Sequence, residues 1–161
     1  MTAAFLVVLL ALGTNSQPAP TRQLTAHKAT TACAAVTRSD VELALGRKIG
    51  AGSEENSMGS STCDYSAGGG QITVTIQHLG AAPDLDQEIA SLKAEFPGST
   101  VRAAAVSGAT AFYLDLGSDG TLLHVIRDGR DYVLVAVLGF GAPASVSGAA
   151  ASLARTALGR M

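Results

Sequence analysis

Three histidines and a few carboxylates are the side chains of this sequence that could carry acid–base chemistry. Of His27, His78 and His124, only His124 falls within a predicted strand next to a strand that carries a carboxylate, Asp115. An imidazole held by a carboxylate, with Tyr113 beside it, is an arrangement that general acid–base catalysis uses. A cross-strand ion pair or hydrogen bond on the less buried face is the simpler interpretation, because no serine or cysteine is placed near the pair. We therefore predict no catalytic residues and keep a hydrolase-like or isomerase-like enzyme using His124 and Asp115 as the alternative.

The two cysteines, Cys33 and Cys63, lack the Cys-x-x-Cys spacing and the nearby histidines of a metal site. In an exported chain they are expected to pair as one structural disulfide, and a reactive or metal-binding thiol pair is the alternative. The run Gly68-Gly69-Gly70 is followed by a strand pattern and not by a helix, so a hairpin turn is expected there and not a phosphate site. No metal or cofactor is predicted.

The segment from Ala109 to Phe140 predicts a three-stranded meander. Its three runs are rich in β-branched, aromatic and aliphatic residues, and Asp-Gly steps at Asp119-Gly120 and Asp128-Gly129 separate them. Asp-Gly between alternating hydrophobic runs is a strong hairpin signal. The rest of the chain must be arranged around this sheet.

Connections of two or four residues would sort the meander into two faces, because side chains alternate along a strand. The face predicted to form the core is nearly all apolar: Phe112, Leu114, Leu116, Leu123, Val125, Tyr132, Leu134, Ala136 and Leu138. The opposite face is mixed and carries the candidate ligand or partner residues: Tyr113, Asp115, His124, Val133, Val135 and Val137, together with Leu122 and Ile126. Three valines facing water would form an exposed apolar patch. Their expected cover is the first helix with the loop 47–61, the N-terminal segment, a partner protein, a second copy or an apolar ligand.

The remaining elements predict an α+β fold, an antiparallel sheet flanked by about three helices. A capping box at Ser39 and Glu42 begins a short helix that ends at Gly46. Strands are expected over 62–65, 71–79 and 100–105, with a weak edge strand near 57–58. A second helix begins at Pro83 or Asp84 and ends near Phe96, and a last helix with a stripe of small residues runs from Pro143 or Ser145 to Gly159.

Composition and the N-terminus indicate an exported protein. The 161 residues are 47% hydrophobic and 15% charged, and the 11 Lys and Arg are scattered, which argues against a nucleic-acid partner. The apolar run from Ala3 to Gly13 has the length of a signal-peptide core and is too short for a bilayer span. We expect a signal-peptide-like segment over 1–16, a flexible leader over 17–31 and one domain over 32–161, with no stable transmembrane span in the mature chain. Lipidation at Cys33, and a helix of the mature core over 3–12, are the alternatives.

Three short motifs, taken in order, resemble small secreted or lipid-anchored bacterial envelope proteins of unknown function, of the kind common in actinobacteria. They are Cys33–Val41 with Ala44-Leu45-Gly46, then Cys63-Asp64-Tyr65, then Val106–Phe112. The resemblance implies a Cys33–Cys63 disulfide, an antiparallel sheet with flanking helices, and no established catalytic residues.

Together these features predict a secreted or cell-envelope domain without enzymatic activity. Its expected partner is an envelope protein or a small apolar ligand, bound at the valine-bearing face or at the loops along its edge.

Overall fold

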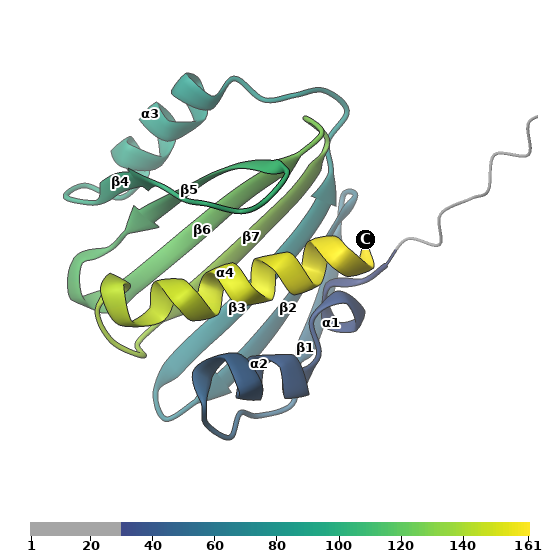
Figure 1. The fold of residues 1–161 in the computed structure, drawn as a ribbon, viewed down its shortest axis with the longest axis vertical. Coiled ribbons are helices and arrows are strands. Elements are labelled where there is room, and N and C mark those ends of the chain that lie inside the picture. The colour runs from purple at the N-terminus through teal and green to yellow at the C-terminus, as the bar shows by residue number, and fades with distance from the viewer. Residues whose placement is uncertain (1–29) are drawn as a thin grey trace, which may run out of the picture.

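The computed structural model describes residues 30–161, so the predicted signal-peptide-like segment and nearly all of the leader lie outside the described residues. The described chain is α+β, as predicted: seven strands form one antiparallel sheet in the order β1-β2-β3-β7-β6-β5-β4 (Figure 1). The elements in chain order are α1 (Ala32–Ala35), α2 (Arg38–Leu45), β1 (Ser53–Ser57), β2 (Ser60–Ala67), β3 (Gly70–His78), α3 (Leu85–Glu95), β4 (Thr100–Ala103), β5 (Ala109–Asp115), β6 (Gly120–Arg127), β7 (Asp131–Leu138) and α4 (Pro143–Arg160), with a single 3-10 turn at Gly117–Asp119.

The N-cap of helix α2 lies two residues before the predicted cap, Ser39. Thr37 is the N-cap, and its backbone N–H donates to the Asp40 carboxylate at 2.8 Å while its own hydroxyl accepts from the Asp40 N–H. Thr37 and Asp40 thus fill the two roles of a capping box that the prediction gave to Ser39 and Glu42. Gly46 ends the helix with φ of 65°, a left-handed conformation that favours glycine.

The predicted meander is present as β5, β6 and β7, but an odd number of residues separates the last paired residues of each hairpin. Five residues lie between the paired Asp115 and Thr121, the last of them being Gly120 at the start of β6, and three lie between the paired Arg127 and Asp131. Asp128 and Gly129 do adopt left-handed conformations, with φ of 53° and 68°, and one further residue follows before β7 begins.

These odd numbers turn β6 over relative to the predicted arrangement. Leu123 and Val125 share a face with Tyr113 and Val135, while Leu122, His124 and Ile126 lie on the face of Phe112 and Leu134. The predicted grouping of β5 with β7 is right, because two reversals of parity cancel; the placement of β6 is wrong.

Helix α4 covers one face of the sheet, with α1 and α2 on the same side (Figure 1). The larger apolar cluster lies under it, so the main core is on the face that was predicted to be mixed. Ala150, Ala154 and Ala157 of α4 have no exposed surface, and such small side chains let a helix axis approach a sheet closely. The predicted stripe of small residues is confirmed as the buried side of this helix.

The opposite face is covered only in part. Leu92 and Phe96, at α3 and its C-cap, pack against a small cluster made by Leu114, Leu122 and Ala136. No residue of α3 is buried. The face predicted to be the core therefore has a much thinner cover than the face beneath α4.

The predicted disulfide joins Cys33 of α1 to Cys63 of β2, with a Cα–Cα distance of 5.0 Å. Around it, the Ala32 N–H donates to Ser61 Oγ at 2.9 Å and the Tyr65 hydroxyl donates to the Val36 carbonyl. The short helix α1 is thus fixed to the sheet by covalent and polar contacts.

We expect the double substitution Cys33→Ser/Cys63→Ser to lower the free energy of unfolding by about 3 to 4 kcal/mol. The bridge closes a loop with a sequence separation of 30, and opening it enlarges the conformational freedom of the unfolded chain. Urea unfolding of the oxidised protein and the variant measures the difference. Reduction of the parent protein should reproduce it, and equal midpoints would contradict a stabilising role for the bridge.

Candidate functional site

The two residues of the predicted acid–base pair lie on opposite faces of the sheet. Asp115 opposes Thr121 on the α4 side, and His124 opposes Phe112 and Leu134 on the other side. The prediction that Asp115 and His124 are neighbours is wrong, because it assumed an even number of residues between the last paired residues of β5 and β6, and that number is five. No catalytic pair of these two side chains exists.

Asp115 belongs instead to a polar cluster that joins the sheet to α4. Arg102 donates two hydrogen bonds to its carboxylate, at 2.6 and 3.2 Å, and the Thr121 hydroxyl donates a third at 2.6 Å. Burial raises the pKa of Asp115, but the bonds from Arg102 and Thr121 outweigh it and hold the pKa below its usual value. Arg102 also contacts Ser147 Oγ and lies 3.9 Å above the Tyr113 ring. The role of Asp115 is structural.

The valine-bearing face of the sheet is buried and not exposed to solvent. Val133, Val135 and Val137 have no exposed area, and Tyr113 is 7% exposed with its hydroxyl donating to the Ser147 carbonyl. Helix α4 is their cover, where the loop 47–61 and the first helix were expected. Five of the six residues predicted to form a ligand or partner face therefore lie on the α4 side of the sheet, and His124 alone lies on the other side.

His124 is the buried histidine of the partly covered face. It is 2% exposed, and its ring stacks on Phe112 with 4.7 Å between centroids and 6° between planes. Its Nδ1 lies 2.8 Å from the Tyr132 hydroxyl, and its Nε2 has no hydrogen-bond partner within the described chain. Burial lowers the pKa of His124 to about 4. Burial first, and the charge of Glu88 second, raise the pKa of Tyr132. The pair is therefore neutral at neutral pH.

A cavity of about 330 Å³ lies against this pair. Its walls come from β3, β5, β6, β7, α3 and the connection that leads into α3, and its polar side chains are Gln77, Glu88, His124 and Tyr132. Sequence reasoning missed this site because Phe112 and Tyr132 were assigned to one face and His124 to the other.

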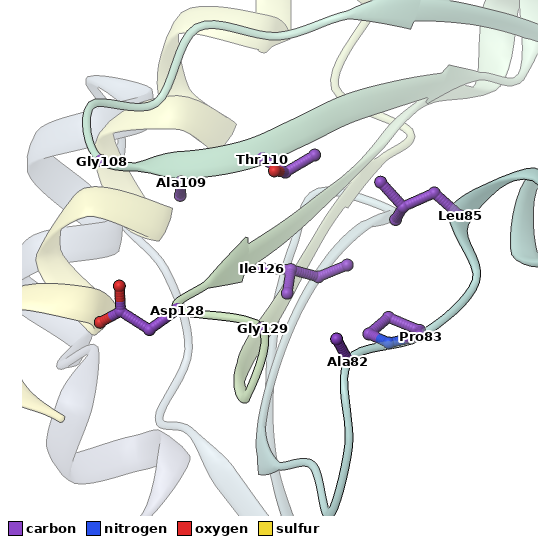
Figure 2. Close-up of a pocket in the computed structure, with 9 residues that line it drawn as sticks. All are labelled: Ala82, Pro83, Leu85, Gly108, Ala109, Thr110, Ile126, Asp128 and Gly129. Carbon is purple, nitrogen blue, oxygen red and sulfur yellow. The ribbon is translucent and has the colours of Figure 1, made fainter.

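A second cavity of about 420 Å³ adjoins the first, since Pro83 and Ile126 line both. Figure 2 shows Pro83 and Leu85, in the chain entering α3, on one side of the space and Thr110 and Ile126 of the sheet on the other. The Asp128 carboxylate points away from Pro83 and Leu85 in this view. The walls of the second cavity are therefore mainly apolar.

No lysine or arginine is among the residues that line either cavity, and the acidic residues there are Glu88 and Asp128. No serine or cysteine is among the residues that line them. Both cysteines of the chain form the disulfide. Among the described residues, no group of three or more His, Cys, Asp or Glu side chains is placed to hold a metal ion. The arrangement offers a mainly apolar space whose smaller cavity has a few hydrogen-bonding groups, the neutral Gln77, His124 and Tyr132 and the acidic Glu88, which suits binding.

No protein-family model, no curated protein and no solved structure matches this chain. Within residues 30–161, no helix has both the length and the apolar character needed to cross a membrane.

We expect the neutral His124 to give the protein a distinct pH dependence of stability. The unfolded chain binds a proton near pH 6.5, but folded His124 binds it only near pH 4, so the unfolded state is favoured as the pH falls through this window. The loss amounts to about 3 kcal/mol at pH 4 relative to pH 7. Asp40 titrates below the window, because a hydrogen bond from Arg160 lowers its pKa to about 2.

Urea unfolding at several pH values measures this effect. His124→Phe keeps an aromatic ring on Phe112 and should remove most of the slope between pH 7 and pH 4. His78→Gln removes an exposed histidine and serves as the matched control. If the free energies of unfolding of His124→Phe and the parent protein fell in parallel between pH 7 and pH 4, protonation of His124 would not be the cause of the lost stability.

Proposed function

We propose that the chain is an exported cell-envelope domain without enzymatic activity that binds a small apolar ligand. The observation that carries this proposal is the pair of adjoining cavities between the sheet and the chain leading into α3, with the His124–Tyr132 pair in the wall of one of them. Pockets for small molecules are typically a few hundred Å³ in volume, largely apolar, and carry a small number of placed polar groups.

The thin cover of this face supports a binding role. Helix α3 has no buried residue, and Leu92 and Phe96 are its contacts with the small apolar cluster on the sheet. Segments with few buried apolar contacts open at low free energy. A ligand can therefore enter beside α3 without disturbing the core beneath α4.

A small-molecule ligand is favoured over a protein partner. The surface predicted for a partner was the valine-bearing face or the loops along its edge, and the three valines of that face are fully buried. The enzyme alternative relied on Asp115 beside His124, and Asp115 is instead bonded to Arg102 and Thr121 on the opposite face.

Export to the envelope is supported by three features. The disulfide is of a kind that persists in oxidising compartments. The apolar run from Ala3 to Gly13 has the length of a signal-peptide core. The order of the motifs around Cys33 and Cys63 resembles secreted or lipid-anchored bacterial proteins.

The test is binding of the neutral dye Nile red, whose fluorescence rises in an apolar space. We expect saturable binding to the full chain and a roughly tenfold weaker affinity for Pro83→Trp, because Pro83 lines both cavities and a larger side chain would fill them. Leu43→Trp is the matched control, since Leu43 is 86% exposed on α2 at the far side of the sheet.

Fluorescence titration gives both affinities, and urea unfolding verifies that the two variants are folded. Unchanged dye binding by folded Pro83→Trp, or no binding by the parent protein, would refute the proposed function.

A further inference from the structure

We propose that the ligand is an uncharged molecule with an apolar body and a hydroxyl group bound at His124, and that the site rejects carboxylates of the same length. This inference rests on the proposed function and adds the chemical class of the ligand. It follows from where the polar groups lie, from the unpaired nitrogen of His124, and from the charges of the walls.

Most of the polar side chains belong to the smaller cavity, while Thr110 and Asp128 line the larger one and the Asp128 carboxylate points away from Pro83 and Leu85. His124, Tyr132 and Gln77 line the smaller cavity, while Pro83 and Leu85 face Ile126 across the larger one (Figure 2). Because Pro83 and Ile126 line both spaces, one elongated molecule can occupy both. Its apolar part would lie in the larger cavity and its polar end at His124.

His124 Nε2 is a buried polar atom without a partner, which is costly in a folded protein. If the Tyr132 hydroxyl donates to Nδ1, then Nε2 carries a hydrogen and needs an acceptor. If Nδ1 carries the hydrogen instead, then Nε2 needs a donor. A hydroxyl group can serve in both cases, so it is the head group that fits either tautomer.

Nε2 is closed to solvent, so the hydroxyl reaches it only after side chains around the cavity shift. Helix α3, which contributes Glu88 to this cavity and has no buried residue, is the wall that is least fixed. Binding would supply the missing hydrogen bond in exchange for this movement.

The charges of the walls exclude a carboxylate head. The side chains facing His124 in the cavity come from β3, the connection to α3, α3 itself, β5, β6 and β7, and Glu88 is the one charged residue among them. The imidazole is neutral at neutral pH, so it offers no positive charge. A ligand carboxylate would lose its hydration and lie near the Glu88 carboxylate, which repels it. For a ligand ammonium group, the attraction to the half-buried Glu88 is smaller than the free energy lost when the group leaves water.

The test is displacement of Nile red from the full chain by three molecules that share one alkyl chain: decanol, decanoate and decylamine. At neutral pH, decanol should displace the dye at roughly tenfold lower concentration than either charged compound. Glu88→Lys places a cation at the cavity and should make decanoate the better competitor. Glu95→Lys makes the same change at an exposed position of α3 that does not line the cavity and should leave the order unchanged.

The imidazole nitrogen resonances of His124 should also shift when decanol is added. Displacement by decanoate or decylamine as effective as by decanol, failure of all three to displace bound dye, or unmoved His124 resonances would overturn this inference and leave the proposed function standing. A parent protein that does not bind Nile red would overturn the proposed function itself.

Discussion

Every side chain in the sheet points to one of two faces, and the number of residues in each hairpin connection decides which face the next strand presents. Five residues lie between the paired Asp115 and Thr121, and three lie between the paired Arg127 and Asp131. With an even number of residues between these pairs, His124 would lie on the α4 side of the sheet, as Asp115 does. The odd numbers place it between Phe112 and Leu134, where the stack with Phe112 and the bond to Tyr132 become possible.

Much of the fold could be predicted from the sequence because local signals are strong. Alternation over β3, the small-residue stripe of α4, and Asp84 as the cap of α3 each determine one element without reference to the others. The disulfide could be predicted because two cysteines in a chain expected to be exported most simply pair with each other. The sheet register does not follow, because a difference of one residue in a connection leaves composition and hydrophobic pattern almost unchanged while it inverts a whole strand.

The candidate site depended on that register and on which face each helix covers, so it could not be predicted. Val133, Val135 and Val137 formed a plausible exposed patch as long as α4 had no assigned face. Conversely, Pro83 and Glu88 appeared only as parts of a helix start, although they line the cavities. Their part in the site arises from the path of the chain between β3 and β4, which no local pattern determines.

The two faces of the sheet are held with very different strength. Helix α4 is fixed along its length: Ser147 near its start contacts Arg102 and Tyr113, and the Leu158 carbonyl near its end accepts from Arg127 at 2.6 Å. At its last residues, Arg160 donates to Asp40 at 2.6 Å and so joins α4 to α2. The disulfide adds a covalent tie between α1 and β2 on the same side.

Helix α3 has no comparable set of contacts. Its hydrogen-bonded side chains, Asp84 at the cap and Ser91 within the helix, bond inside the segment itself, and the apolar contacts of Leu92 and Phe96 connect it to the sheet. Since stability resides mainly on the α4 side, α3 can shift without loosening the core. A buried histidine with an unpaired nitrogen is tolerable in such a fold, because the contacts beneath α4 supply most of the stability while the opposite face holds the two cavities.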